Sequence, residues 1–150
     1  MRALPTYYHR TNQAPTNRRL LHLDGDRNGG RVINTAVVSN VAPRYAPPGI
    51  ALIASTVLCH DDGLESPVRG HAARIHGVDP QHWEHVALYP ISAALPAMPA
   101  GQALRQPVDL GDGIFVAGDH RDTPSIQGAL ASGHRAAQAI RGYLTGTRRS

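Results

Sequence analysis

A short, wholly apolar run between two glycines does most to limit the folds open to this chain. Residues 114–117 read IFVA, Gly113 and Gly118 flank them, and Asp119 follows directly. A continuous apolar run of this length is typical of a strand that is buried on both faces, as in a parallel sheet. The sequence therefore predicts a buried strand that ends at Gly118 and Asp119.

A long helix is predicted after this strand, from about Ser125 to about Leu144. Its apolar residues recur at the helical period, and they are Ile126, Ala129, Leu130, Gly133, Ala137, Ile140 and Leu144. Thr123 or Ser125 can cap the start of the helix. A strand, a turn and a helix in this order present the helix N-terminus to a ligand.

The first turn of this helix would supply the ligand contacts. Its unpaired N–H groups, from about Ile126, Gln127 and Gly128, carry a partial positive charge that favours an anionic or electron-rich atom. Asp119 can accept hydrogen bonds from sugar or ribityl hydroxyls, or it can simply cap the turn. Both interpretations are open from the sequence.

Small residues are frequent inside the same helix. Gly128, Ser132 and Ala136 are spaced by four, and Gly133 lies on a neighbouring row. A glycine inside a helix costs about 1 kcal/mol relative to alanine, so Gly128 and Gly133 need a reason. Close approach of a cofactor or another helix is one reason, and tight packing on a sheet without a ligand is the alternative.

The first two-thirds of the chain read mainly as β-structure. Strand formers occur at residues 6–9, 19–23, 32–38 and 50–58, and the turn-rich residues 24–30 indicate a hairpin over residues 19–38. Residues 83–91 are expected to be extended, and residues 92–107 to form an irregular crossing segment. Short turns between these strands favour antiparallel pairing.

One short helix is predicted within this β region, over residues 66–77. Ser66 can cap it, and Gly77 suits its C-terminal end. Val68, Ala72 and Ile75 then fall on one apolar face.

Composition and motifs exclude several functions. The chain has 15 basic residues, a net charge of +4 and no lysine, which excludes a Schiff-base lysine or a P-loop. The arginines are scattered, so no specific nucleic-acid partner is expected. No G-x-S-x-G hydrolase elbow occurs. No apolar stretch suits a membrane span or a signal peptide, and the lone Cys59 suits a reducing compartment, so a cytoplasmic location is expected.

Histidine clusters do not predict a metal site. His82 and His85 are three residues apart, but their segment reads as extended and the spacing fits no zinc motif. His60, next to Asp61 and Asp62, lies in a polar loop. We therefore predict no metal.

Tyrosines offer a separate clue to a substrate. Tyr7, Tyr8 and Tyr45 either line a substrate pocket or pack in the core. The core is the simpler interpretation.

The strand, turn and helix resemble a known cofactor motif. Residues 113–119 (GIFVAGD) and 123–137 (TPSIQGALASGHRAA) resemble the C-terminal flavin-binding motif of the flavin amine-oxidase superfamily, which includes protoporphyrinogen-oxidase-like and phytoene-desaturase-like enzymes. The resemblance is strong over residues 104–142 and looser before them.

This resemblance implies a set of flavin contacts. Asp119 would lie near the ribityl–pyrophosphate part of FAD, and Gly118 would allow close approach. The helix start, with Ser125, Ile126, Gln127 and Gly128, would meet the N1/C2-carbonyl edge of the isoalloxazine. The family implies hydride transfer from a C–H bond of a small-molecule substrate to flavin N5. No catalytic side chain is assigned.

The resemblance also implies what the chain lacks. The N-terminal G-x-G-x-x-G that holds the FAD pyrophosphate in this family does not occur here. We therefore expect an incomplete FAD site and an α+β fragment of a two-domain FAD oxidoreductase. Residues 1–103 would belong to an antiparallel or mixed substrate-binding sheet with one short helix. Residues 104–150 would supply the last strand and helix of a Rossmann-like FAD domain.

Two hypotheses about the chain's role follow. In the first it is the C-terminal part of the oxidoreductase. In the alternative it is a non-catalytic fragment or interaction module that docks on a separately encoded dinucleotide-binding half.

Overall fold

The computed structural model describes residues 1–26, 29–58 and 64–146. The chain divides into two compact units, Met1–Ala94 and Leu95–Ser150. Each unit has its own architecture. The helices in the described part include none with the length and hydrophobicity to cross a membrane.

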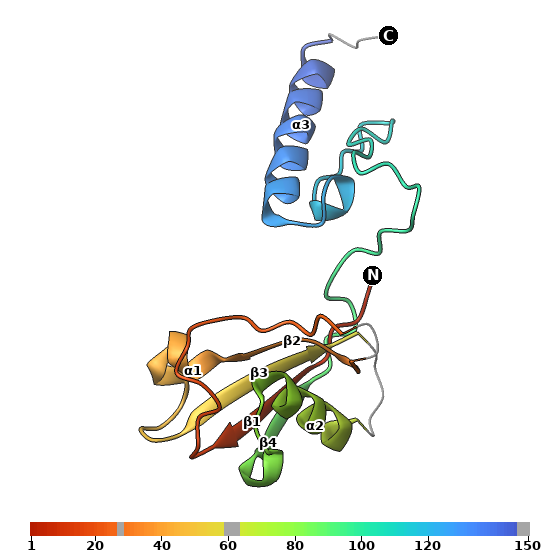
Figure 1. Ribbon diagram of the computed structural model, residues 1–150. Helices are drawn as coiled ribbons and strands as arrows, with labels where there is room; N and C mark the ends of the chain where they lie inside the picture. The colour runs from red at the N-terminus through yellow and green to blue at the C-terminus, as the bar shows by residue number, and fades with distance from the viewer. Residues whose placement is uncertain (27–28, 59–63, 147–150) are drawn as a thin grey trace. The chain divides into compact units, whose positions relative to one another are not determined.

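A four-stranded antiparallel sheet forms the first unit (Figure 1). Its strands are β1 (Thr6–Thr11), β2 (Val32–Val37), β3 (Ala51–Val57) and β4 (Glu84–Tyr89), in the order β2-β3-β1-β4. The two inner strands, β1 and β3, therefore come from distant parts of the chain. A register shift between Tyr8 and His9 interrupts the pairing of β1 with the edge strand β4.

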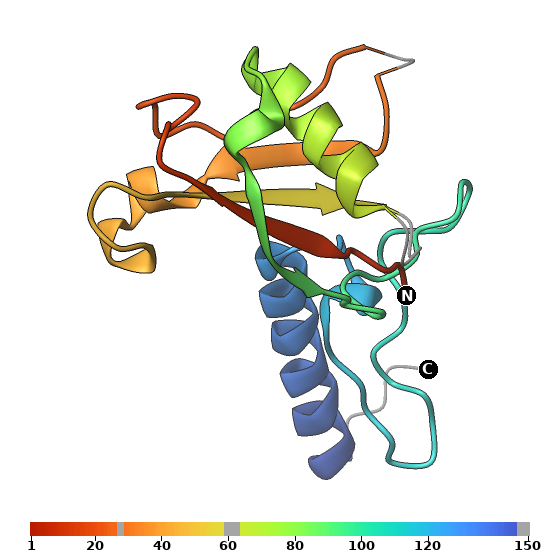
Figure 2. The ribbon, with the colours of Figure 1, turned by 90° about the horizontal axis from the view of Figure 1, so that it is seen from below.

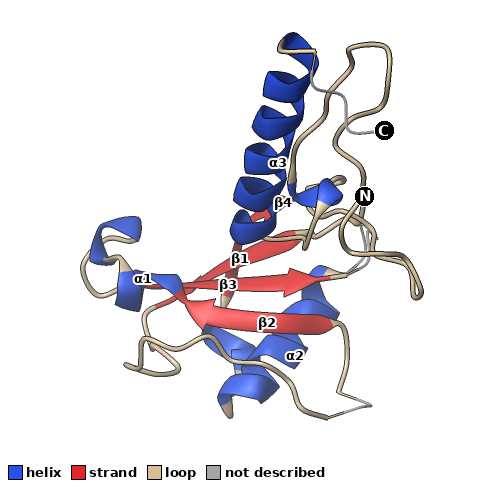
Figure 3. Ribbon diagram, turned by 90° about the horizontal axis from the view of Figure 1, so that it is seen from above, coloured by secondary structure: helices blue, strands red, loops and turns tan. Residues whose placement is uncertain are grey.

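Helix α2 (Glu65–His76) packs on one face of this sheet (Figure 3). Alternate residues of β3 are buried, as a strand with one covered face requires. Ile53 and Val57 of β3 share a core with Val68 and Ala72 of α2. Trp83, the only tryptophan in the sequence, also packs in this core and is 3% exposed.

The ends of α2 confirm one sequence prediction and correct another. Gly77 ends the helix with φ +70° and ψ 32°, the left-handed conformation that glycine adopts most easily. The predicted cap at Ser66 is wrong, because the helix begins at Glu65 and no side chain caps it. The predicted apolar face is correct: Val68 and Ala72 are fully buried and Ile75 packs against the core.

Short helices complete this unit. They are α1 (Val38–Val41) and the 3-10 helices η1 (Pro43–Tyr45) and η2 (Pro80–His82). The expected hairpin over residues 19–38 is reduced to one bridge between His22 and Thr35, with N–O distances of 2.8 and 2.9 Å. β2 instead pairs with β3, which offers a full-length neighbour.

The second unit contains η3 (Asp119–Arg121) and α3 (Ile126–Leu144). The predicted strand at residues 114–117 is wrong: a single antiparallel bridge joins Phe115 to Asp109. A strand needs a neighbour for its N–H and C=O groups, and among the described residues the run pairs only with residues 108–110 across a tight turn. Ile114 is 59% exposed, so the run is not buried on both faces.

Candidate functional site

The start of α3 is capped by its own sequence. Ser125 is extended, with φ −155° and ψ 166°, and its Oγ accepts a hydrogen bond from the N–H of Gly128 at 3.0 Å. The Thr123 hydroxyl lies 3.0 Å from the same Oγ. The predicted helix and its Ser125 cap are confirmed, but the N–H of Gly128 is engaged by the chain itself.

Two of the three expected amide donors remain at the helix tip. Within the described residues, no hydrogen bond from the N–H groups of Ile126 and Gln127 is found. Both residues are exposed, Ile126 to 79%. The tip can therefore donate two hydrogen bonds to an electron-rich edge, aided by the positive end of the helix dipole.

Gly118 is fixed against α3 by Ser132. The buried Ser132 Oγ accepts from the Gly118 N–H at 2.9 Å and lies 2.7 Å from the Gly118 carbonyl, to which it donates. Gly118 has φ +149° and ψ 170°, and a Cβ there would lie 2.6 Å from the His120 ring. Both the conformation and the space therefore favour glycine.

Asp119 follows at the first position of η3 and is half-buried. Its carbonyl accepts the Asp122 N–H at 3.2 Å. No hydrogen bond to its carboxylate is found from the residues that the structure describes. The carboxylate is therefore able to accept hydrogen bonds from a ligand.

Gly128 and Gly133 of α3 occupy different surroundings. A Cβ on Gly128 would lie 1.8 Å from the carbonyl oxygen of Thr123, so the turn before the helix packs directly on it. A Cβ on Gly133 would meet nothing within 4 Å. Packing within the chain explains Gly128, whereas nothing in the described chain explains Gly133.

Arg135 holds the turn to the helix, a role that the sequence analysis missed. Its guanidinium donates to the carbonyls of Gln106 at 3.0 Å and Arg121 at 2.7 Å, and to Asp122 Oδ2 at 3.0 Å. The Thr123 N–H and then Arg135 hold the pKa of Asp122 below its usual range. No local pattern reveals this contact, because its partners lie 13 to 29 residues away.

The predicted apolar stripe of α3 faces outward. Ile126, Leu130 and Leu144 are 79%, 70% and 76% exposed. The buried residues of α3 are instead Gly128, Ser132 and Ala136, on the opposite side. The helix period was predicted correctly, but the stripe has no partner within the described chain.

The first unit offers a separate apolar hollow on the sheet face opposite α2. A cavity of about 440 Å³ is lined by Thr6, Tyr8, Leu52, Val86, Ala87, Tyr89 and Ile91. The rings of Tyr8 and Tyr89 meet edge to face at 5.5 Å. Tyr7 lies in the core and Tyr45 is exposed, so of the three predicted tyrosines only Tyr8 lines this cavity.

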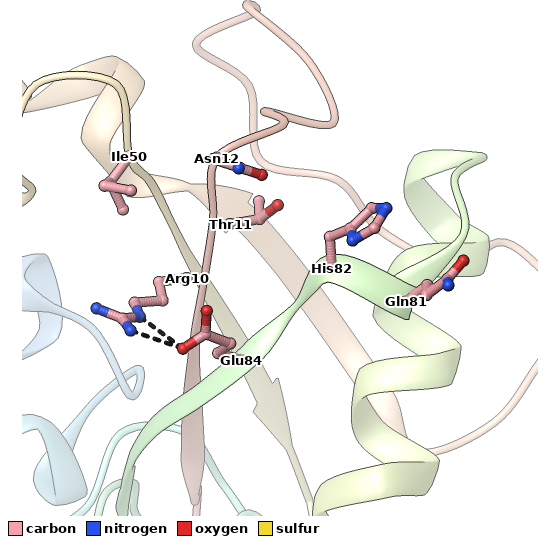
Figure 4. Close-up of a pocket in the computed structure, with 7 residues that line it drawn as sticks. All are labelled: Arg10, Thr11, Asn12, Ile50, Gln81, His82 and Glu84. Carbon is pink, nitrogen blue, oxygen red and sulfur yellow. Dashed lines mark hydrogen bonds and ion pairs between the residues drawn. The ribbon is translucent and has the colours of Figure 1, made fainter.

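A more polar hollow of about 360 Å³ lies where β1 ends and β4 begins (Figure 4). Arg10 donates to Glu84 Oε2 from Nε at 3.1 Å and from NH2 at 2.6 Å. Both side chains are more than half exposed, so the pair is a weak surface ion pair. His82 lines this hollow, whereas His85 does not. The residues His60, Asp61 and Asp62 lie outside the described part of the chain.

Comparison with solved structures defines the class of fold. The chain is similar to the crystal structure of an oxidoreductase from Methanosarcina mazei, with a TM-score of 0.59 at 14% sequence identity. The similarity covers 91% of this chain and 34% of that one, so this chain spans about a third of the length of the similar protein. At this identity the likeness concerns the fold.

The sequence gives the family. The profile of the flavin-containing amine oxidoreductases matches residues 10–141, and the chain belongs to that family. This confirms the resemblance found in the sequence. The search among curated proteins found no match.

Proposed function

We propose that this chain forms part of an FAD-dependent oxidoreductase and that the start of α3 binds the pyrimidine edge of the flavin. The observation that carries the proposal is the pair of N–H groups at Ile126 and Gln127, which have no acceptor among the described residues. Family membership supports a flavin as the ligand. A bound flavin would accept a hydride from a substrate C–H bond.

The residues of the chain fit such a group in a defined way. The Ile126 and Gln127 amides would donate to the N1/C2-carbonyl edge, and Ser125 would keep the tip in place through Gly128. The helix dipole would favour negative charge at that edge by about 0.3–2 kcal/mol, depending on burial. Gly118 would let the cofactor approach, and the Asp119 carboxylate would accept hydrogen bonds from its ribityl chain.

The substrate would bind in the first unit. We assign residues 1–103 to the substrate-binding region and 104–150 to the flavin-binding region. The apolar cavity beside Tyr8 and Tyr89 supports this assignment, because an amphipathic aromatic wall suits a small apolar substrate. No side chain of this chain is proposed to transfer a proton.

A dinucleotide-binding part would complete the FAD site. The exposed stripe at Ile126, Leu130 and Leu144 supports this, since a sheet or helix packed there would bury it. The alternative, a non-catalytic module that docks on a separate half, predicts the same docking without turnover. The lone cysteine in the sequence supports a cytoplasmic location.

The test replaces one amide donor without breaking the helix. Proline is tolerated in the first helical turn and has no N–H, and the extended Ser125 suits a residue before proline. Ile126→Pro therefore removes one proposed flavin contact, while Ile126→Ala keeps the amide and loses the same side chain. The variants are coexpressed with a dinucleotide-binding half that carries G-x-G-x-x-G.

We expect Ile126→Pro to weaken FAD retention about 3- to 10-fold relative to Ile126→Ala, as for one lost hydrogen bond. Equal retention by the two variants, with helix content unchanged, would refute the placement of the flavin at this tip. Flavin retention without turnover would favour the docking module. The chain alone is expected to be colourless after purification.

A further inference from the structure

Three potential metal ligands converge on the α2 side of the sheet in the first unit, whereas the proposed flavin contacts belong to the second unit. His9 of β1 and His85 of β4 are paired across the two strands, and their rings lie 5.7 Å apart. Glu65, the first residue of α2, places Oε1 3.1 Å from His9 Nε2. Figure 2 shows β1, β4 and α2, the elements that bring these residues together.

We propose that His9, Glu65 and His85 form a binding site for a divalent transition metal of the Zn²⁺ type. One ligand atom from each residue lies within 4.8 Å of the others, and in the described part of the chain this is the one such group of three. Ligands around tetrahedral zinc lie about 3.3–3.5 Å apart, as bond lengths of roughly 2.0–2.2 Å require. The His9–Glu65 distance is close to that value.

The remaining adjustment falls on the less buried side chains. His85 is exposed and Glu65 is half-buried, whereas His9 is fully buried. A movement of at most about 1.5 Å by His85 would bring the three ligand atoms to tetrahedral spacing. The exposed side would leave a fourth position for water.

His9 Nε2 is the ring nitrogen that faces Glu65. Its Nδ1 is buried and has no hydrogen-bond partner within the described structure. A metal binds a deprotonated ring nitrogen, so Zn²⁺ would displace any proton that Nε2 shares with Glu65.

The positive charge of Arg69 opposes metal binding and lowers the affinity of the site for the metal. Its Nε lies 3.3 Å from Glu65 Oε1, and its NH1 donates to the Trp83 carbonyl at 3.0 Å. The guanidinium thus competes for the carboxylate and repels a cation. Removing the Arg69 charge should therefore strengthen metal binding. If the cluster were only a structural ion pair, the same change should weaken the cluster.

The sequence analysis considered His82 with His85 and rejected this pair as a metal site. In the structure His82 belongs to η2 and lines the polar hollow. The partner of His85 is instead His9, 76 positions earlier in the chain. His82 therefore makes a matched control: it is an exposed histidine three residues from the proposed ligand.

Zn²⁺ titration of the full chain by calorimetry tests the site, with His85→Ala and Glu65→Gln as ligand variants and His82→Ala as the control. We expect one equivalent to bind in the original protein and in His82→Ala. Affinity should fall at least about 10-fold in His85→Ala and Glu65→Gln. Arg69→Gln should bind Zn²⁺ about 10- to 30-fold more tightly, as the repulsion between a unit charge and a divalent ion about 4–5 Å apart in a watery setting predicts.

Co²⁺ supplies an independent readout, since its visible absorption reports coordination geometry. The original protein and His82→Ala should give a tetrahedral spectrum that His85→Ala lacks. Absence of a one-equivalent site, or equal losses in His82→Ala and His85→Ala, would overturn the proposal. If circular dichroism shows that His85→Ala alters the fold, Glu65→Gln takes its place. Equal losses of Zn²⁺ affinity in Glu65→Gln and His82→Ala would then overturn the proposal.

Discussion

The hydroxyl of Ser132 binds both polar backbone groups of Gly118, at 2.9 Å from its nitrogen and 2.7 Å from its carbonyl oxygen. One buried side chain thereby holds the turn before α3 against the helix itself. The pair is separated by 14 residues, so it fixes tertiary structure rather than a local turn. The stability of the second unit should therefore depend on this contact.

Ser132→Ala should destabilise the second unit by about 1–3 kcal/mol, because it leaves the Gly118 N–H without its acceptor. Amide hydrogen exchange at Gly118 should accelerate accordingly. The exposed substitution Gln138→Ala on the same helix should change stability by less than about 0.5 kcal/mol. Unchanged exchange at Gly118 in Ser132→Ala would show that the hydroxyl does not hold the turn.

Gly128→Ala and Gly133→Ala should have opposite effects. The first places a Cβ 1.8 Å from the Thr123 carbonyl and should destabilise the helix start by more than about 2 kcal/mol. The second meets nothing within 4 Å and should stabilise the chain by up to about 1 kcal/mol through helix propensity. Thermal unfolding followed by circular dichroism compares the two variants. Destabilisation by both substitutions would contradict the difference in free space around Gly128 and Gly133.

The first unit should lose stability in acid through His76. Burial, and then the charge of nearby His22, lowers the pKa of His76 from 6.5 to about 4. The unfolded chain therefore binds the proton more readily than the folded one. The stabilisation that neutral His76 gives the folded state is complete above pH 6.5 and is lost as the pH falls toward 4. We expect a loss of about 2 kcal/mol, allowing for solvent screening of a partly exposed ring.

Fluorescence of Trp83, whose ring centre lies 6.1 Å from that of His76, can follow urea unfolding across this pH range. His76→Gln should flatten the pH dependence, and a weaker slope from His9 should remain, because burial lowers its pKa too. Exposed His134→Gln serves as the control. A slope that is the same in His76→Gln and the original protein would exclude His76 as the cause.

Leu130→Glu tests the exposed stripe of α3. Because Leu130 is 70% exposed, the substitution should leave the stability of the chain alone within about 0.5 kcal/mol. It should reduce copurification with a dinucleotide-binding half, since it places a charge in the interface. Gln138→Glu, off the stripe, should copurify normally. Equal copurification of both variants would remove the stripe from the proposed interface.

The sequence predicted those elements whose signals are local. The αL conformation of Gly77, the apolar face of Val68 and Ala72, and the Ser125 cap all depend on neighbours within a few residues. Hydrophobic period and capping chemistry therefore located α2 and α3 closely. The family motif located the turn at Gly118 and Asp119.

The failures share a different cause, which is the need for distant partners. Residues 114–117 have the composition of a buried strand, but the described chain supplies only one bridging neighbour, at Asp109. Arg135 and His9 look unremarkable in sequence, because their contacts join segments far apart. Which face of α3 is buried also depended on the turn that packs against Gly128, and periodicity cannot choose between faces.

Because Ser125 closes the end of α3 by itself, the tip has its final shape before any cofactor arrives. A flavin would meet donors already aligned, and little conformational entropy would be lost on binding. In the proposed assembly, the cofactor and the dinucleotide-binding half could therefore bind in either order.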